Sequence, residues 1–225
     1  MGHISYNPFL AFAMYLVLHQ LLFDKFISRL MRTTYTFFAI TMTFNMFITG
    51  GRAGQVMFFV SLIVLSFQFF KDSQVKASLM AIFLVTVIAL VGYNYSGVFK
   101  ERVFAVLVDL DKFSYNQDTS IGHRIVFTKN TLEIIKSSPL FGVGTGDYPV
   151  EYKKVNQANT PTSRDTVHPH NMYLYVQSQL GIVGLISFFW IFYSQFNFAL
   201  KSKDEFVKHV GVSLPLLFLV IMLSD

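Results

Sequence analysis

Two arginines and a histidine in this sequence are of the types that act in transfer from phosphorylated donors. Arg52 follows a Thr-Gly-Gly stretch, Arg124 follows Gly-His, and His170 is the second histidine of a His-Pro-His-Asn segment. A guanidinium group binds phosphate through two parallel hydrogen bonds. A neutral imidazole accepts a proton from a hydroxyl near pH 7. If the three side chains meet, they form a site that moves a group from a phosphorylated donor to a hydroxyl.

Each of these residues also has an interpretation without catalysis. Arg52 can extend its charge from an apolar helix to the membrane surface, and Arg124 can be solvated on the polar face of a helix. The His168-x-His170 pair can bind a metal. We predict no metal site, because the sequence offers no acidic residue or third histidine at helical spacing to complete the ligand set.

The composition is that of a membrane protein. Of 225 residues, 53% are hydrophobic and only 14% are charged, whereas soluble domains carry about 25% charged residues. The net charge of +5 is spread between apolar runs, which favours a membrane protein over one that binds nucleic acid. The absence of cysteine excludes a disulfide framework or thiolate metal site. No cleavable signal peptide is expected, because the first seven residues contain no Lys or Arg.

Six apolar runs predict the membrane spans, since about 20 helical residues cross the hydrocarbon layer. We therefore expect an all-α, polytopic transmembrane helical bundle, with four helices in residues 1–93 and two in residues 171–225. The runs cover residues 8–23, 33–48, 55–70, 77–93, 173–198 and 210–223.

A long polar stretch, residues 94–170, separates the fourth and fifth runs. Loops of this length are usually functional or form small subdomains. Within it, residues 121–137 mix apolar and charged positions at helical spacing, which predicts an amphipathic helix. The Ser138-Pro139 pair ends that helix. The following Gly142-x-Gly144-x-Gly146 is weak as a nucleotide motif, because no β-strand precedes it, and predicts only a tight turn.

The distribution of basic residues predicts the orientation. Threading the six runs alternately places eight Lys and Arg residues on one side and Arg52 alone in the short loop opposite. Cytoplasmic loops carry the excess of basic residues, so the long loop and Arg52 are expected on the non-cytoplasmic side. Arg52 and His170 then both stand at the mouth of an apolar run, where an ionisable group is costly unless it faces protein or water. The eight residues are Lys25, Arg29, Arg32, Lys71, Lys76, Lys201, Lys203 and Lys208.

The motifs occur in an order that resembles the O-antigen ligase and polymerase superfamily. The resemblance covers most of the chain, and the full series at these spacings is more specific than any one piece. It comprises Tyr6-Asn7-Pro8, Arg52, Gly122-His123-Arg124, Ser138-Pro139-Leu140-Phe141-Gly142-Val143-Gly144-Thr145-Gly146, His168-Pro169-His170-Asn171-Met172-Tyr173-Leu174 and Gly181-Ile182-Val183-Gly184-Leu185.

This resemblance implies a multi-pass glycosyltransferase of the bacterial inner membrane that acts in lipopolysaccharide biosynthesis without metal or cofactor. Such enzymes move a glycan from an undecaprenyl-pyrophosphate carrier to an acceptor hydroxyl on the periplasmic side, where the long loop would lie. By motif, His170 would be the general base, and Arg52 and Arg124 would hold the pyrophosphate. His168 and Asn171 would be accessory residues.

The acceptor remains open among three kinds. Ligation of O-antigen onto lipid A-core is the first expectation, polymerisation of repeat units the second, and transfer to a protein hydroxyl the third. Besides donor and acceptor, only membrane lipids are expected as partners. From another class of protein, a transporter would need ionisable residues buried in mid-span, whereas the arginines here stand at the rim.

The sequence departs from the family pattern at four points. Gly51 precedes Arg52 where the family often has Ser, Phe127 stands where Trp is frequent, and Gln179 stands where Glu is common. Family members also have more spans than the six predicted here. We therefore expect a C-terminal portion, a truncated product or a short member.

Overall fold

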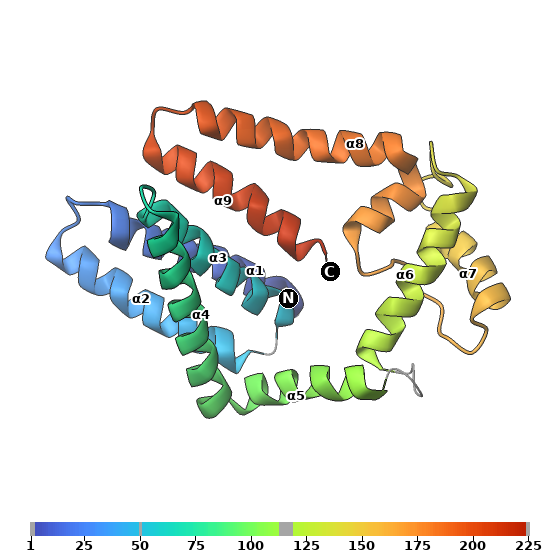
Figure 1. The fold of residues 1–225 in the computed structure, drawn as a ribbon, viewed down its shortest axis with the longest axis horizontal. Helices are drawn as coiled ribbons and strands as arrows, with labels where there is room; N and C mark the ends of the chain where they lie inside the picture. The colour runs from blue at the N-terminus through green and yellow to red at the C-terminus, as the bar shows by residue number, and fades with distance from the viewer. Residues whose placement is uncertain (1–2, 50, 113–118, 224–225) are drawn as a thin grey trace. The chain divides into compact units, whose positions relative to one another are not determined.

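The computed structural model describes residues 3–49, 51–112 and 119–223, and the regular elements in that part of the chain are all helices. The predicted all-α class is confirmed. The chain divides into two compact units, drawn in Figure 1. The first comprises Met1–Val103 and Ala199–Ile221, and the second comprises Phe104–Phe198 and Met222–Asp225.

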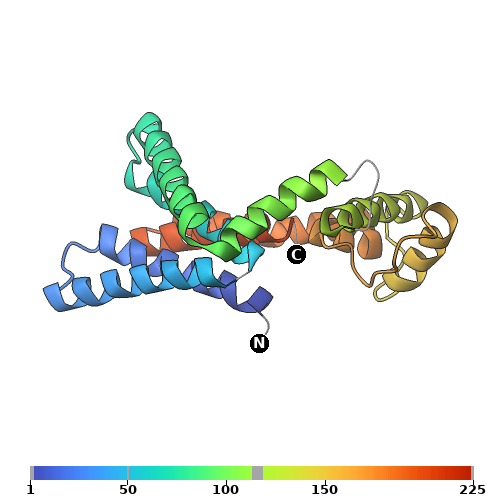
Figure 2. The ribbon, with the colours of Figure 1, turned by 90° about the horizontal axis from the view of Figure 1, so that it is seen from below.

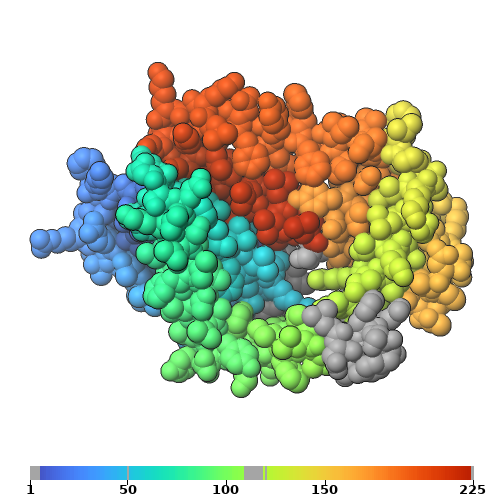
Figure 3. Space-filling view, viewed as in Figure 1, coloured from blue at the N-terminus to red at the C-terminus, as the bar shows by residue number. Residues whose placement is uncertain are grey.

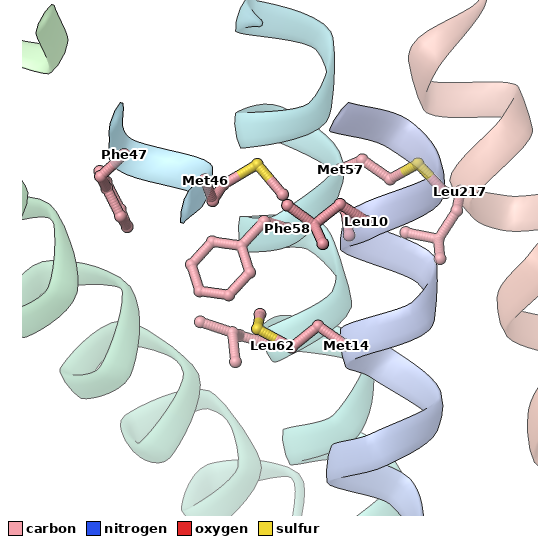
Figure 4. Close-up of a cluster of buried hydrophobic side chains, with 9 residues drawn as sticks. Leu10, Met14, Met46, Phe47, Met57, Phe58, Leu62 and Leu217 are labelled. Atoms are coloured by element: carbon pink, nitrogen blue, oxygen red, sulfur yellow. The ribbon is translucent and has the colours of Figure 1, made fainter. Parts of the chain in front are cut away.

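The first unit is built around α3, which packs against α1, α4 and α9, while α1 also packs against α2. Apolar side chains from α1, α2, α3 and α9 meet in its core (Figure 4); Leu10, Met46, Phe58 and Leu217 are examples. The helices are α1 (His3–Phe23), α2 (Arg29–Ile48), α3 (Arg52–Phe69), α4 (Gln74–Tyr95) and α9 (Glu205–Ile221).

Four helices of the described chain are long and apolar enough to cross a membrane, namely α1, α3, α4 and, in the second unit, α8 (Met172–Lys201). A polytopic membrane protein is therefore confirmed. The 22 residues of α4 span about 33 Å at 1.5 Å per residue, enough for a hydrocarbon core about 30 Å thick. Helix α4 lies uncovered toward the viewer in Figure 3. Its exposed side chains include Leu79, Ile82 and Phe83. Such side chains suit contact with lipid.

Helices also occupy the other two predicted runs, as α2 and α9. The five threonines of α2 each donate a hydrogen bond to the backbone carbonyl four residues earlier, so their hydroxyls are satisfied inside the helix. Helix α2 can therefore face apolar surroundings in spite of its polar composition. The donors are Thr33, Thr34, Thr36, Thr41 and Thr43.

The two ends of the first unit agree with the alternate threading. At one end, Ser96 after α4 donates to the carbonyl of Phe47 near the end of α2, at 2.6 Å. At the other end, Lys71 after α3 lies 3.7 Å from Glu205 at the start of α9. Arg52 at the start of α3 therefore lies at the end of the first unit opposite Lys71, and the side of the membrane that each end faces stays a prediction.

A polar cluster lies within the helices of the first unit, where the sequence showed no pattern. The His19 and His209 rings meet edge to face, with Nε2 of the first 3.0 Å from Nδ1 of the second. Gln68 of α3 donates to Ser213 at 2.9 Å, and Ser213 donates to the Tyr15 hydroxyl at 2.8 Å. Interhelical hydrogen bonds of this kind hold membrane helices together. They tie α9 to α1 and α3.

The second unit begins within α5 (Gly97–Lys112) and continues through α6 (Ser120–Ser137), α7 (Tyr148–Asn159) and most of α8. The amphipathic helix predicted over residues 121–137 is present as α6. Thr119 caps it by accepting a hydrogen bond from the backbone N–H of Gly122. Helices α6 and α7 lie side by side (Figures 1 and 2) and enclose a core that includes Ile134 and Tyr152.

The predicted fifth span differs from expectation, because α8 is broken at Gly181, where φ is +65°. The break frees backbone groups that the turn after α6 satisfies. The N–H groups of Val143 and Gly144 donate to the carbonyls of Ser178 and Gln179, and the N–H of Ile182 donates to the carbonyl of Pro139. The Gly142–Gly146 turn is thus the docking partner of the α8 kink. The sequence predicted the turn but not its partner.

Replacing Gly181 by Ala is expected to destabilise the second unit. A Cβ there would lie 2.2 Å from the carbonyl carbon of Leu140, and the positive φ disfavours any side chain. Strain of this kind typically costs about 2–4 kcal/mol. Thermal unfolding in detergent should show a lower midpoint for G181A. G97A is the control, because its added Cβ meets open space and should leave the midpoint unchanged.

Candidate active site

The His168-Pro169-His170 segment forms a constrained turn just before α8. His170 adopts φ +55°, and it is the only described residue other than glycine with a positive φ. Its backbone N–H donates to Nδ1 of His168 at 3.2 Å. A neutral His168 therefore carries its proton on Nε2. Thr166 holds the other side of the turn, donating to the His168 carbonyl at 2.7 Å. His168 thus fixes the backbone that presents the His170 imidazole.

Phe127 of α6 connects this turn to the helix that bears Arg124. The His170 ring stacks on Phe127, with centroids 6.0 Å apart and planes 19° from parallel. His123 stacks on the same ring at 5.9 Å and 15°. Phe127 itself is only 1% exposed, so it is a fixed platform.

Arg124 is half-buried in the first turns of α6. Residues three apart on a helix are neighbours on its surface, so Arg124 lies beside the Phe127 platform. The structure therefore brings the Arg124 helix and the His170 turn together in one unit. Arg52 belongs to the other unit, and its approach to His170 stays a prediction.

Asn171 takes a structural position. Its side-chain oxygen accepts a hydrogen bond from the backbone N–H of Leu174 at 3.1 Å, which caps the start of α8. Its amide nitrogen donates to the carbonyl of Leu223 at 3.3 Å. Asn171 thereby orients the helix that follows His170. A role in contact with substrate is still only a prediction.

A cleft of about 490 Å³ opens beside the His170 turn. Its lining mixes apolar surface with two cationic residues, Lys153 of α7 and Arg164 of the loop before His168. Neither residue was predicted from the sequence, in which the one signal is that Arg164 lies four residues before His168. The lining is completed by Phe127, Pro149, Asp165, Thr166, Val167, His168 and His170.

Two tyrosines under the cleft hold α6 and α7 together. The Thr131 hydroxyl donates to the Phe127 carbonyl at 2.6 Å. In its 2.8 Å contact with Tyr148, Thr131 is therefore the acceptor and the tyrosine hydroxyl is the donor. Burial raises the pKa of the Tyr148 hydroxyl above its usual value, and burial likewise raises the pKa of Tyr152. Both phenols stay protonated near neutral pH, so an imidazole is the better base in this region.

Arg52 is the first residue of α3 and is half-buried. The loop before it is held by Asn7 of α1, a fully buried side chain. Asn7 accepts a hydrogen bond from the Thr49 hydroxyl at 2.9 Å. A Cβ on Gly51 or Gly54 would lie within 2.3 Å of Asn7, so glycine is required at both points. The Tyr6-Asn7-Pro8 motif therefore acts by positioning the turn that presents Arg52.

The start of α3 is also favourable for an anion. Its N-cap residue is Gly51, which has no side chain to bond the first N–H groups of the helix. Free N–H groups at a helix N-terminus, together with the helix dipole, attract phosphate. Arg52 adds a guanidinium at the same place.

No group of three or more His, Asp or Glu side chains that could hold a metal occurs among the described residues. His168 and His170 are close, with ring centroids 4.2 Å apart. The contact between them uses Nδ1 of His168 as a hydrogen-bond acceptor. That transfer proceeds without a metal stays a prediction.

Helices long and apolar enough to cross a membrane, together with an imidazole on an aromatic platform beside a cleft, are the features of a membrane protein with a candidate active site. The chain belongs to the O-antigen ligase family, whose sequence model matches residues 37–189, more than half of the chain. The resemblance to that superfamily is thus confirmed. The match includes Arg52, Arg124 and His170.

A search of curated proteins adds one relative. The chain is 25% identical over 212 residues to an uncharacterized protein of Haemophilus influenzae. The alignment covers 91% of this chain and 51% of that protein, so the chain spans about half the length of the curated relative it matches.

Proposed function

We propose that this chain transfers a glycan from undecaprenyl pyrophosphate to an acceptor hydroxyl on the periplasmic side of the inner membrane, and that the acceptor is lipid A-core. The proposal rests on family membership and on one observation above all. The positive-φ backbone of His170 and the stacking of its ring on Phe127 fix the imidazole at the edge of the cleft. Ordered presentation of a base beside a cleft is what transfer to a hydroxyl requires.

In the proposed reaction, the acceptor oxygen attacks the anomeric carbon of the donor glycan. The bond between that carbon and the pyrophosphate oxygen breaks, and undecaprenyl pyrophosphate leaves. The acceptor proton passes to His170. Arg52 and Arg124 bind the pyrophosphate and stabilise the negative charge that grows on it. Two guanidinium groups supply this charge without a metal.

The distribution of buried groups favours an enzyme over a transporter. Among the residues whose side-chain burial the structure describes, which leaves out 109–118, no Asp, Glu, Lys or Arg is buried. The histidines His19 and His209 within the helices bond to each other. A transport pathway through the membrane requires a series of buried ionisable groups. Among the described residues of the four candidate spans, the buried ionisable side chains are Tyr15 and His19 of α1, too few to form such a series.

Deletion of the gene tests the proposal through the glycans of the cell surface. Loss of a ligase should leave O-antigen polymer on its lipid carrier and lipid A-core bare. Loss of a polymerase would instead leave core with a single repeat unit, and loss of a protein glycosyltransferase would leave the lipopolysaccharide ladder intact. Either of the last two patterns would contradict ligation and identify the acceptor class.

Transfer by the purified protein should persist in excess EDTA, because guanidinium groups take the place of a metal at the pyrophosphate. The measurement compares initial rates with and without chelator on a lipid-pyrophosphate glycan donor. Loss of rate in EDTA that a divalent cation restores would show that a metal takes part.

A further inference from the structure

The cleft beside His170 has a charge pattern that the proposed reaction does not use. Lys153 and Arg164 line it from different elements, and neither forms an ion pair with another described residue. Neighbouring Lys154, by contrast, is paired with Glu151 at 2.6 Å. The one acid in the lining, Asp165, accepts a hydrogen bond from Asn156 at 2.9 Å. Two cations of the cleft are therefore available to a ligand.

Arg164 is held in place although its side chain is exposed. Asn156 of α7 is only 3% exposed, and its amide nitrogen donates to the carbonyl of Ser163 and to the carboxylate of Asp165, both at 2.9 Å. The residues on either side of Arg164 are thus anchored by one buried amide. Thr160 and Asn130 extend the same network into the core. The Arg164 guanidinium lies over Phe127, 5.8 Å from the ring centroid.

The position of the cleft indicates which substrate these cations meet. His170 and Arg164 share the cleft and the Phe127 platform. If His170 takes the proton of the acceptor hydroxyl, the molecule in this cleft is the acceptor. A volume of about 490 Å³ lies within the range of about 300–1,000 Å³ that holds small molecules or parts of a glycan. The lining combines apolar surface with the charged side chains of Lys153, Arg164 and Asp165, a mixture that suits a sugar with an anionic substituent better than a lipid tail.

We propose that the cleft binds the acceptor through an anionic substituent, a phosphoryl or carboxylate group close to the glycosylated hydroxyl, held by Arg164 and Lys153. The guanidinium fork of Arg164 bonds two oxygens of the anion, and Lys153 adds a second charge. This inference rests on the proposed transfer to a hydroxyl at His170. It names the class of acceptor that the site selects.

The test pairs changes in the enzyme with changes in the acceptor. Lipid A-core is compared before and after chemical removal of its phosphoryl groups, and in a parallel arm after reduction of its carboxyl groups. Hydrogen bonds to charged groups are strong enough that losing the anion should raise the wild-type KM for acceptor about tenfold. In R164Q/K153Q, KM should already be raised about tenfold and should not change further when the same anion is removed.

K154Q is the matched control, because its lysine is paired with Glu151 and does not line the cleft. It should keep the wild-type dependence on acceptor charge. Equal sensitivity to anion removal in the wild type and R164Q/K153Q would overturn the proposal. So would a rise confined to the KM for the donor, which would assign these cations to the pyrophosphate. Absence of any transfer by the wild type would instead contradict the proposed function itself.

Discussion

Replacing His170 by Asn should reduce glycan transfer about 10²- to 10⁴-fold, the range typical of losing a general base. Asn is chosen because it tolerates the positive φ of +55° at this position better than most residues. The substitution removes the imidazole while the turn and the α8 cap remain. The amount of protein in the membrane should not change. Initial rates on a lipid-pyrophosphate donor, normalised to that amount, give the measurement.

His168→Asn provides the matched control. An Asn side-chain oxygen can accept the His170 N–H as Nδ1 of His168 does. The turn should persist, and transfer should fall only a few-fold. If H170N cells made a normal lipopolysaccharide ladder, His170 would not be the base. If H168N lost as much as H170N, the two histidines would share the proton transfer.

Replacing Arg52 by Lys should reduce transfer about 10²- to 10³-fold, as loss of one transition-state hydrogen-bond donor does. Lysine keeps the charge but lacks the planar fork that bonds two phosphate oxygens. Arg52 stands at the N-terminus of α3 with no side-chain cap before it, so its charge adds to that of the helix end. Rates measured at saturating acceptor and varied donor should show the loss mainly in kcat.

Arg32→Lys is the control for this substitution. Arg32 is exposed in the first turn of α2 and belongs to the basic group predicted on the cytoplasmic side. Its replacement should leave the rate unchanged. Wild-type activity of R52K would show that Arg52 acts as a simple charge or only anchors α3 at the membrane surface. The bidentate role would then be wrong.

The sequence predicted the helices well because apolar runs of helical length are typical of membrane spans, and four of the six helices are long and apolar enough to cross a membrane. All six runs are helical, and α6 lies where its apolar spacing placed it. The break of α8 at Gly181 was not predicted, because a single glycine inside an apolar run is compatible with a continuous helix. Its effect depends on the Gly142 turn, nearly forty residues earlier, which satisfies the freed backbone groups.

Residue chemistry and the family resemblance singled out His170, Arg52 and Arg124, and their roles as base and phosphate-binding groups stay predictions. Contacts between distant segments required the tertiary structure. Phe127 carries no charge and gives no signal in the sequence, and its stacking on His170 joins the Arg124 helix to the His turn. Arg164 and Lys153 are ordinary surface cations in the sequence, and the packing of α7 against α6 makes them neighbours of the same cleft. The sequence determines which side chains are available for a site. Which of them lie close together depends on contacts between distant segments, and the spacing of residues within one segment does not specify those contacts.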